Sequence, residues 1–442
     1  QQAVLDDVLA QRVKFLFVAP ERMRNSAFQG LLQQIQIGLL AVDEAHCVSQ
    51  WGQDFRPGYL NIAPFLARLP VRPAVGAFTA TATDVADLSP LEAVPVMADG
   101  EALDLKANSA ILIEQGTGRV LYEKDSSTKS APASITKIMS LILVFEAIDN
   151  GALTYDTILT CSDSAAALGG SQIWLEPGET MSVHELLKAV CVVSANDATV
   201  MLAEAVAGSE ESFVVLMNDK AKELNMNNTN FVNCTGLDAE NHYSCALDVA
   251  LMSAELLKHK KVTEYTTIWM DSLRNGESEL VNTNKLVRFY EGCTGLKTGT
   301  TSGAGYCLSA SAKRDGLSLI AVVMNGETSK DRFAAAQKLL NYGYAHYKNM
   351  EIVPSNEEFS VKVNKGTVDS LKLTAEGTLY ALVKKSEKGE ITSQVMLPDS
   401  VKAPIKKGDK IGEIVYSIND REIGIIELLS DKNIEKKNMS TG

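Results

Sequence analysis

The sequence predicts a multidomain chain with three parts: a partial α/β unit, a larger α+β domain and a small C-terminal β-sandwich. Three observations predict it. Apolar runs separated by helical or loop segments occupy the first eighty-odd residues, strands flank a helical middle at 102–348, and alternating hydrophobicity with repeated turn signals follows from residue 353. The 442 residues, 45% of them hydrophobic, are enough for two to four such units.

The α/β unit is predicted from residues 1–85. Apolar runs at 14–19, 38–42 and 73–79 favour buried parallel strands. The second run leads into Asp43-Glu44-Ala45-His46, and an acidic pair at the carboxyl end of a parallel strand is a common place for a magnesium nucleotide. Residues 86–101, acidic and containing prolines, predict a linker.

Three short strings in the α+β domain point to acyl transfer by a serine without a catalytic histidine. They are Ser134-Ile135-Thr136-Lys137, Ser194-Ala195-Asn196 and Lys297-Thr298-Gly299. Pro132 marks a helix start, and the apolar residues after Lys137 recur at helical spacing, so Ser134 is expected in the first turn with Lys137 on the same side. In that position the amine can accept the serine proton.

The other two strings are expected beside the first, as further walls of a cleft. Ser194-Ala195-Asn196 lies between helical runs at 184–193 and 197–206, which predicts a tight connection. Lys297-Thr298-Gly299 precedes a predicted hairpin with strands at 305–310 and 317–324, and its glycine allows a substrate to approach the backbone. Alone, the first string is also compatible with a capping serine and a solvated lysine, the second with a turn between helices, and the third with a hairpin that carries an exposed lysine.

With these strings, residues 102–428 resemble the serine D-alanyl-D-alanine carboxypeptidases, the low-molecular-mass penicillin-binding proteins. Further matching segments include Gly116-Thr117-Gly118-Arg119-Val120-Leu121-Tyr122 and Leu175-Glu176-Pro177-Gly178-Glu179. The resemblance implies a domain of the type shared with β-lactamases, with helices on both faces of an antiparallel sheet and a helical lobe, at 102–348. It implies that the β-rich domain at 353–428 is a spacer from the membrane.

The resemblance also implies roles for individual residues. Ser134 is the nucleophile toward the peptide bond between the terminal D-alanines of a peptidoglycan stem peptide, Lys137 is its base, and Ser194 relays a proton to the leaving group. Asn196, Lys297, Thr298, Gly299 and Thr300 bind the substrate, and β-lactam antibiotics acylate Ser134. No cofactor and no metal are implied. Preference for carboxypeptidase or endopeptidase action, and for one stem peptide over another, stays open.

A β-lactamase-like hydrolase on the same fold is the alternative. Class A β-lactamases deacylate through a glutamate and a water molecule and carry Ser-Asp-Asn in the second string. This chain has Ser194-Ala195-Asn196, and no equivalent glutamate is evident in its sequence. We therefore expect a slowly released penicillin adduct.

Residues 1–85 resemble part of the motor of a RecQ-type DNA helicase, a RecA-like fold. The segments that carry the resemblance are Ala19-Pro20-Glu21-Arg22, Asp43-Glu44-Ala45-His46 and the aromatic loop from Ser49 to Pro57. The resemblance implies nucleotide contacts for Asp43, Glu44 and His46 and DNA contacts for Trp51, Phe55 and Arg56. No G-x-x-x-x-G-K-[ST] phosphate loop and no second motor domain are present in the sequence, so we expect an inactive helicase remnant in a fusion that is natural or artefactual.

Charge and residue composition narrow the possible functions further. Residues 1–85 carry equal numbers of acidic and basic residues, so the net charge of −13 falls entirely on the remainder, which disfavours binding to nucleic acid. The seven cysteines include no C-x-x-C pair, which disfavours a zinc or redox site, and Cys191 and Cys307 are expected in the core. None of the five histidines suggests a Ser-His-Asp triad.

Location follows from the resemblance alone. It places the peptidase part on the cell-wall side of a bacterial membrane, and the helicase-like part would be cytoplasmic. No signal peptide is visible at the first residues, although Pro95-Val96-Met97-Ala98 resembles the end of a cleavage region. The tail at 429–442 is polar, so contact with a membrane surface is expected only through a further C-terminal anchor.

Overall fold

A computed structural model describes residues 39–42, 74–77, 103–354 and 357–437. The chain divides into two units, residues 1–92 and 93–442, and each is considered by itself. No helix within the described ranges is both long and apolar enough to cross a membrane.

The first unit contains one described strand pair. β1 (Leu39–Val42) and β2 (Ala74–Ala77) run parallel, with Leu39 opposite Ala74 and Val42 opposite Ala77. Two of the three predicted parallel strands are thus confirmed. The strand expected at 14–19 and the residues Asp43, Glu44, His46, Trp51, Phe55 and Arg56 lie outside the described residues.

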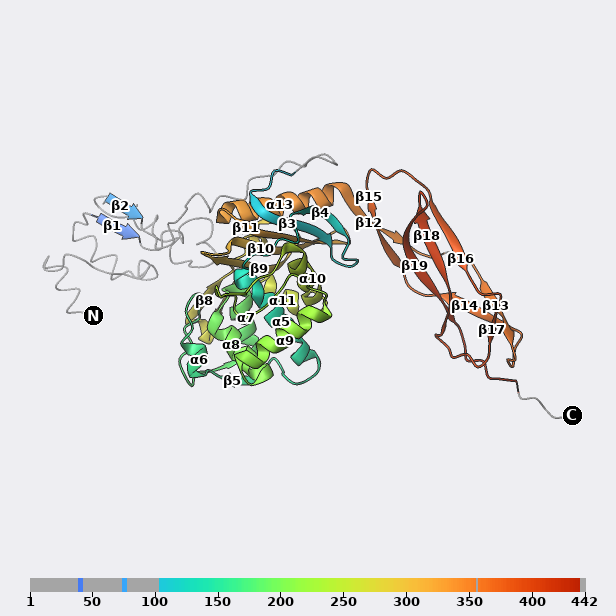
Figure 1. Cartoon of the computed structure of the whole chain (residues 1–442), viewed down its shortest axis with the longest axis horizontal. Coiled ribbons are helices and arrows are strands. Elements are labelled where there is room, and N and C mark those ends of the chain that lie inside the picture. Colours follow the sequence, from blue (N-terminus) through green and yellow to red (C-terminus); the bar gives the residue numbers. More distant parts are fainter. Residues whose placement is uncertain (1–38, 43–73, 78–102, 355–356, 438–442) are drawn as a thin grey trace, which may run out of the picture. The chain divides into compact units, whose positions relative to one another are not determined.

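The larger, α+β part of the second unit is built on a five-stranded antiparallel sheet of order β4-β3-β11-β10-β9. Its strands are β3 (Ala107–Glu114), β4 (Val120–Lys124), β9 (Cys293–Thr301), β10 (Gly305–Arg314) and β11 (Leu317–Gly326). Helix α13 (Ser329–His346) packs on one face and α10 (Ala246–Leu256) on the other (Figure 1). β9 forms one edge of this sheet and faces the helical lobe, which leaves it available for the site.

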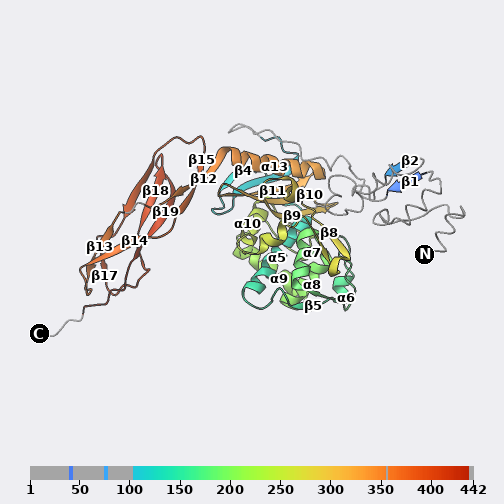
Figure 2. The ribbon, with the colours of Figure 1, turned by 180° about the vertical axis from the view of Figure 1, so that it is seen from behind.

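The helical lobe lies on the face of the sheet opposite α13 (Figures 1 and 2). Its longer helices are α5 (Lys137–Asp149), α7 (Val183–Val192), α8 (Asn196–Ala207) and α9 (Glu210–Glu223). Shorter elements are α6 (Asp163–Ala166), α11 (Val262–Thr266), α12 (Leu286–Phe289), the 3-10 turns η5 (Ala133–Thr136) and η6 (Arg274–Gly276), and the pairs β5 (Ile158–Thr160) with β6 (Thr180–Ser182) and β7 (Met270–Leu273) with β8 (Ser278–Val281).

Helix α5 is the centre of the lobe. The sequence predicts one buried face, at Ile138, Leu141, Ile142 and Phe145, and these residues are buried. However, every residue from Lys137 to Phe145 is buried, because α8 and α9 pack on this helix on one side and α10 on another. A helix that is apolar all round is a core helix, which makes α5 a rigid support for the serine that precedes it.

The C-terminal part is β-rich, as predicted. A six-stranded sheet has the order β16-β18-β19-β14-β13-β17, and β12 pairs separately with β15. The strands are β12 (Tyr347–Ile352), β13 (Phe359–Asn364), β14 (Ser370–Ala375), β15 (Leu379–Lys384), β16 (Ile391–Met396), β17 (Ser400–Lys402), β18 (Lys410–Ile418) and β19 (Arg421–Ser430). Phe359, Val361 and Val363 alternate inward and share one core with residues of both sheets.

Candidate active site

The serine and lysine of the first string are in contact. Lys137 Nζ lies 2.9 Å from Ser134 Oγ. Ser134 belongs to the 3-10 turn η5, whereas the sequence predicts it in the first turn of the α-helix, which begins only at Lys137. A 3-10 turn has three residues per turn and so brings residues three apart onto the same line, which is the arrangement that this pair needs.

Lys137 is fully buried, and its surroundings favour the neutral amine. Its Nζ also lies 2.7 Å from the carbonyl oxygen of Thr235. Burial holds the pKa of Lys137 well below its ordinary value, and the charge of Lys297 acts in the same direction, against smaller opposing contributions from Cys234 and Asp197. An amine that is neutral near physiological pH can accept a proton from the adjacent hydroxyl.

The second string provides polar atoms without partners. Ser194 lies between α7 and α8 with a φ of 64°, a left-handed conformation that is uncommon for serine. Ser194 and Asn196 are buried, and neither Ser194 Oγ nor Asn196 Oδ1 has a hydrogen-bond partner among the described residues. A buried unpaired polar atom costs about 1–3 kcal/mol, so these two atoms are suited to receive polar groups of a ligand.

Asp197 fixes the loop that borders the second string. Its buried carboxylate accepts hydrogen bonds from the backbone N–H groups of Ile173 and Leu175, each at 3.1 Å. Asn196 adds two bonds, from Nδ2 to Gly169 O and from its backbone N–H to Ser171 O, both 2.7 Å. Sequence reasoning gave Asp197 no role, although an acidic residue in the first turn of a helix was a usable signal.

The third string lies on the edge strand β9, and Lys297 in it is buried. Its Nζ donates to Thr298 O at 3.1 Å. Burial, with a smaller contribution from the charge of Arg332 and against an opposing one from Cys191, lowers the pKa of Lys297 to about 7. Thr298 Oγ1 lies 2.7 Å from Thr283 Oγ1, and the Thr283 N–H donates to Val192 O at 3.0 Å, which ties this string to the end of α7 just before Ser194.

Gly299 lets β9 lie against η5, the turn that carries Ser134. A Cβ at this position would stand 2.9 Å from Pro132 O and 3.0 Å from the backbone nitrogens of Ser134 and Ile135. Thr300, the next residue, is exposed. Its Oγ1 accepts a hydrogen bond of 2.9 Å from Arg332 Nη1, which also bonds Gly299 O at 3.2 Å. Arg332 comes from α13, and no local pattern in the sequence marked it.

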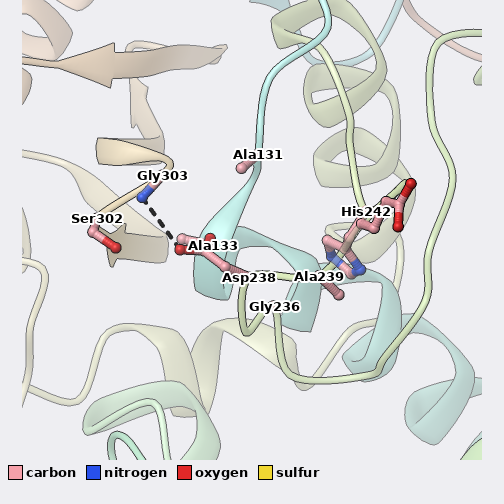
Figure 3. Close-up of a pocket in the computed structure, with 9 residues that line it drawn as sticks. Ala131, Ala133, Gly236, Asp238, Ala239, His242, Ser302 and Gly303 are labelled. Carbon is pink, nitrogen blue, oxygen red and sulfur yellow. Dashed lines mark hydrogen bonds between the residues drawn. The ribbon is translucent and has the colours of Figure 1, made fainter.

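A second glycine, Gly236, also lies against this turn (Figure 3). Gly236 has a φ of +87°, and a Cβ there would overlap Ala133 O at 1.8 Å. Asn233 Oδ1 holds this segment by accepting from the N–H groups of Thr235 and Gly236 at 3.2 and 2.7 Å. The carbonyl of Thr235, which contacts Lys137, is therefore held in place beside the turn that carries Ser134.

His242 serves the same turn as a neutral residue. Its Nδ1 accepts from the Val232 N–H at 3.0 Å, so Nε2 carries the proton and donates to Thr136 Oγ1 at 2.8 Å. Burial lowers the pKa of His242 to about 4. The ring therefore has a structural role.

Cys191 and Cys307 are buried, as predicted. Within the described residues no three His, Cys, Asp or Glu side chains could hold a metal ion together.

The three strings are thus brought to one place, between the helical lobe and the edge strand. Ser134 and Lys137 are in direct contact, and Gly299 adjoins Ser134. The charge of Lys297 lowers the pKa of Lys137, and Thr283 links Thr298 to Val192 at the end of α7, two residues before Ser194. The arrangement offers a half-buried hydroxyl, an adjacent amine whose pKa is lowered, a second buried hydroxyl, an amide and a second buried lysine.

Comparisons with known proteins point to one family for most of the chain. The family model described as D-alanyl-D-alanine carboxypeptidase matches residues 96–328, and the model of the penicillin-binding protein 5 C-terminal domain matches residues 347–436. The DEAD/DEAH box helicase model matches residues 1–88.

Individual relatives agree with the first two models. The chain is 42% identical to D-alanyl-D-alanine carboxypeptidase DacF of Bacillus subtilis over 341 residues. The matched region covers 76% of this chain and 88% of that protein. Penicillin-binding protein 5 from Haemophilus influenzae superposes with a TM-score of 0.67 at 29% identity, covering 76% of this chain and 99% of that one. Penicillin-Binding Protein D2 from Listeria monocytogenes, in its ampicillin-bound form, gives 0.51 at 34% identity, covering 55% of this chain and 100% of that one.

Proposed function

The chain belongs to the D-alanyl-D-alanine carboxypeptidases, and on that premise we propose how its residues remove the terminal D-alanine of a peptidoglycan stem peptide. The observation that carries the proposal is the 2.9 Å contact between Ser134 Oγ and the buried amine of Lys137. A serine beside a base that is neutral at working pH is an activated nucleophile.

Acylation comes first. Ser134 Oγ attacks the carbonyl carbon of the penultimate D-alanine, and its proton passes to Lys137 Nζ. The carbonyl oxygen becomes an oxyanion between the backbone N–H groups of Ser134 and Thr300, which Gly299 allows to lie close together. As the C–N bond breaks, Ser194 delivers a proton to the leaving amine of D-alanine and regains one from Lys137. The product is an ester on Ser134.

Substrate recognition uses the remaining polar groups. The terminal carboxylate pairs with Lys297 and Thr298, on the strand that ends beside the nucleophile, and the carboxylate keeps Lys297 protonated. Asn196 Oδ1, which has no partner among the described residues, accepts from the N–H of the substrate backbone. A peptide without a free terminal carboxylate would leave Lys297 buried without a counter-charge.

Water completes the cycle. It attacks the ester carbonyl, gives one proton to Lys137 and releases the shortened peptide, while Ser134 recovers its proton from Lys137. β-Lactams enter the same route, as the ampicillin-bound Listeria relative suggests. They give an ester on Ser134 that hydrolyses slowly.

The β-lactamase alternative is separable by turnover. A β-lactamase would hydrolyse a chromogenic cephalosporin in a continuous steady state, whereas we expect one burst of about one equivalent per chain followed by a slow phase. Sustained rapid hydrolysis would favour the alternative.

Release of D-alanine from a synthetic peptide ending in D-Ala-D-Ala tests the proposal. Ser134→Ala should abolish release, and Ser127→Ala, an exposed serine in the segment before the site, should retain the parent rate. Persistent release by Ser134→Ala would refute the assignment of the nucleophile.

We place this activity on the cell-wall side of a bacterial membrane, because that is where stem peptides are exposed. The helicase-like residues 1–88 take no part in it, since the Ser134, Ser194 and Lys297 strings all lie in the second unit. Contact with a membrane or with nucleic acid forms no part of the proposed reaction.

A further inference from the structure

The C-terminal domain, residues 347–437, has a sheet edge that is open along a whole strand. β16 is an outer strand of the six-stranded sheet, and β18 is its only strand partner within the described residues. Figure 1 shows β16 at the margin of the domain. All six of its side chains are exposed. The backbone groups of β16 that point away from β18 therefore form a row of donors and acceptors that another strand can pair with.

β16 also carries apolar side chains on the core side of the sheet. Ile391 lies opposite Ile418 of β18, and opposite residues of an antiparallel pair share one face. Val395 lies opposite Ile414 in the same way. Both β18 residues are 2% exposed, whereas Ile391 is 36% and Val395 39% exposed. The apolar face of the sheet therefore continues past the part that the core of the domain covers.

Other outer strands of the second unit are protected against pairing. β17, at the opposite edge of the same sheet, has three residues and ends in Lys402. β4, at an edge of the five-stranded sheet, carries Glu123 and Lys124. Short length and charged side chains are devices that keep a free edge from pairing. β16 has six residues and includes no charged residue, no proline and no glycine, so its sequence permits a further strand.

The distribution of charge favours a second copy of the chain as the partner. Residues 347–437 contain 15 lysines and arginines and 15 aspartates and glutamates, so the C-terminal domain is neutral, while the whole chain carries −13. Two copies therefore repel each other through the rest of the chain and meet with least repulsion at this domain. A strongly charged partner of either sign would find no opposite charge on β16.

We propose that β16 pairs with β16 of a second copy, antiparallel about a two-fold axis at Ser393, so that the two six-stranded sheets become continuous. In this register Ile391 of each copy faces Val395 of the other, and the apolar residues left uncovered on the core side cover one another. On the other face Thr392 meets Gln394. Like charges do not oppose each other within the strand pair. The inference is independent of the proposed function.

Sedimentation equilibrium of the full chain tests the association. One strand pair is a small interface, so we expect a weight-average mass that rises from one chain towards two as the concentration increases. Val395→Lys puts a charge on both edges of the dimer and should weaken the association by about ten-fold, since the two-fold axis repeats the lost pair. Val215→Lys, at a valine of α9 that is 59% exposed, is the matched control and should associate like the parent.

A cross-link tests the register and does not depend on the folding of Val395→Lys. Ser393→Cys would place two thiols at the two-fold axis, where opposite Cβ atoms lie about 4.5–5.5 Å apart, close to the distance that a disulfide spans. Oxidation by diamide should link Ser393→Cys into a dimer. Ser360→Cys, at an exposed position of β13 in the same sheet, should cross-link no more than the parent.

Three results would overturn the proposal. They are a parent chain that stays monomeric at every concentration, an association that Val395→Lys leaves unchanged, and equal cross-linking of Ser393→Cys and Ser360→Cys. The first would leave the β16 edge to a different protein, and the second would place the contact between copies elsewhere on the chain. The third would exclude the register centred on Ser393.

Discussion

Two buried lysines define the chemistry of the site at the scale of single residues. Lys137 and Lys297 are almost completely buried, and burial of an ammonium group disfavours its charged form. The proposed roles need opposite protonation states. Lys137 must be neutral to accept a proton, whereas Lys297 must be charged to pair with a carboxylate. The charge of Lys297 lowers the pKa of Lys137, so the lysine that we propose to bind the substrate also helps to keep the proposed base neutral.

The pH dependence of kcat/KM should report Lys297. Its pKa is about 7, so in the free enzyme Lys297 loses the positive charge that pairs with the substrate carboxylate as pH rises through that value. The kcat/KM for a D-Ala-D-Ala peptide should therefore have a falling limb near neutral pH. In Lys297→Arg the guanidinium stays charged, and the falling limb should disappear at whatever rate remains. A falling limb that stays at the same pH in Lys297→Arg would assign it to another group.

The same lysine should destabilise the protein at neutral pH. Its pKa is lower in the folded chain than in the unfolded chain, so the unfolded state binds more protons between about pH 7 and 10 and the free energy of unfolding rises with pH in that window. Lys297→Met should remove this contribution and stabilise the chain below pH 7 by up to about 5 kcal/mol. Urea unfolding at pH 7 and pH 9.5 measures it, and equal pH slopes for parent and variant would contradict it.

At the scale of elements, close approach of backbones positions the nucleophile. β9 reaches η5 through Gly299, and the segment after Asn233 reaches it through Gly236. α5 follows this turn and is buried from Lys137 to Phe145. Ser134 is thus set by three elements from distant parts of the sequence, and its geometry depends on positions where a side chain has no room.

Gly236→Ala should therefore abolish acylation by penicillin. Its Cβ would stand 1.8 Å from Ala133 O, so η5 must shift away from Lys137 or Thr235. Gly208→Ala is the matched control, because Gly208 has a similar φ of +82° at the end of α8, and a Cβ added there would have no atom within 4 Å. Both variants should lose about 1 kcal/mol from the left-handed conformation, and only Gly236→Ala should lose acylation. Equal acylation rates in the two would contradict this account.

Elements with local signals were predictable from the sequence. Asp315 and Gly316 form the two-residue turn between β10 and β11, both with positive φ, as an Asp-Gly turn between apolar strands indicates. The order of the three strings along the chain predicted a site for acyl transfer by a serine. Arg332 and Thr235 could not be given their roles, because each acts through a contact with a residue far along the chain and neither carries a distinctive local pattern.

At the scale of the whole molecule, the chain combines segments with unrelated resemblances. The carboxypeptidase and penicillin-binding protein 5 models match the second unit, and the helicase model matches residues 1–88. In the first unit the described parallel pair β1 and β2 agrees with an α/β fragment. The nucleotide and DNA contacts expected there belong to residues outside the described ranges and stay predictions.

The purified 442-residue chain should hydrolyse no ATP, with or without single-stranded DNA. Its sequence contains no phosphate loop to hold the nucleotide, whatever Asp43 and Glu44 do. Phosphate release with and without DNA measures this, and DNA-stimulated turnover would show that the helicase-like segment has activity.

The central claim is that Ser134 is an acylated nucleophile in a folded site, and intact-mass measurement after brief incubation with penicillin tests it most directly. We predict one penicillin added per parent chain and none on Ser134→Ala. The same adduct on Ser134→Ala, or no adduct on the parent chain, would contradict the account.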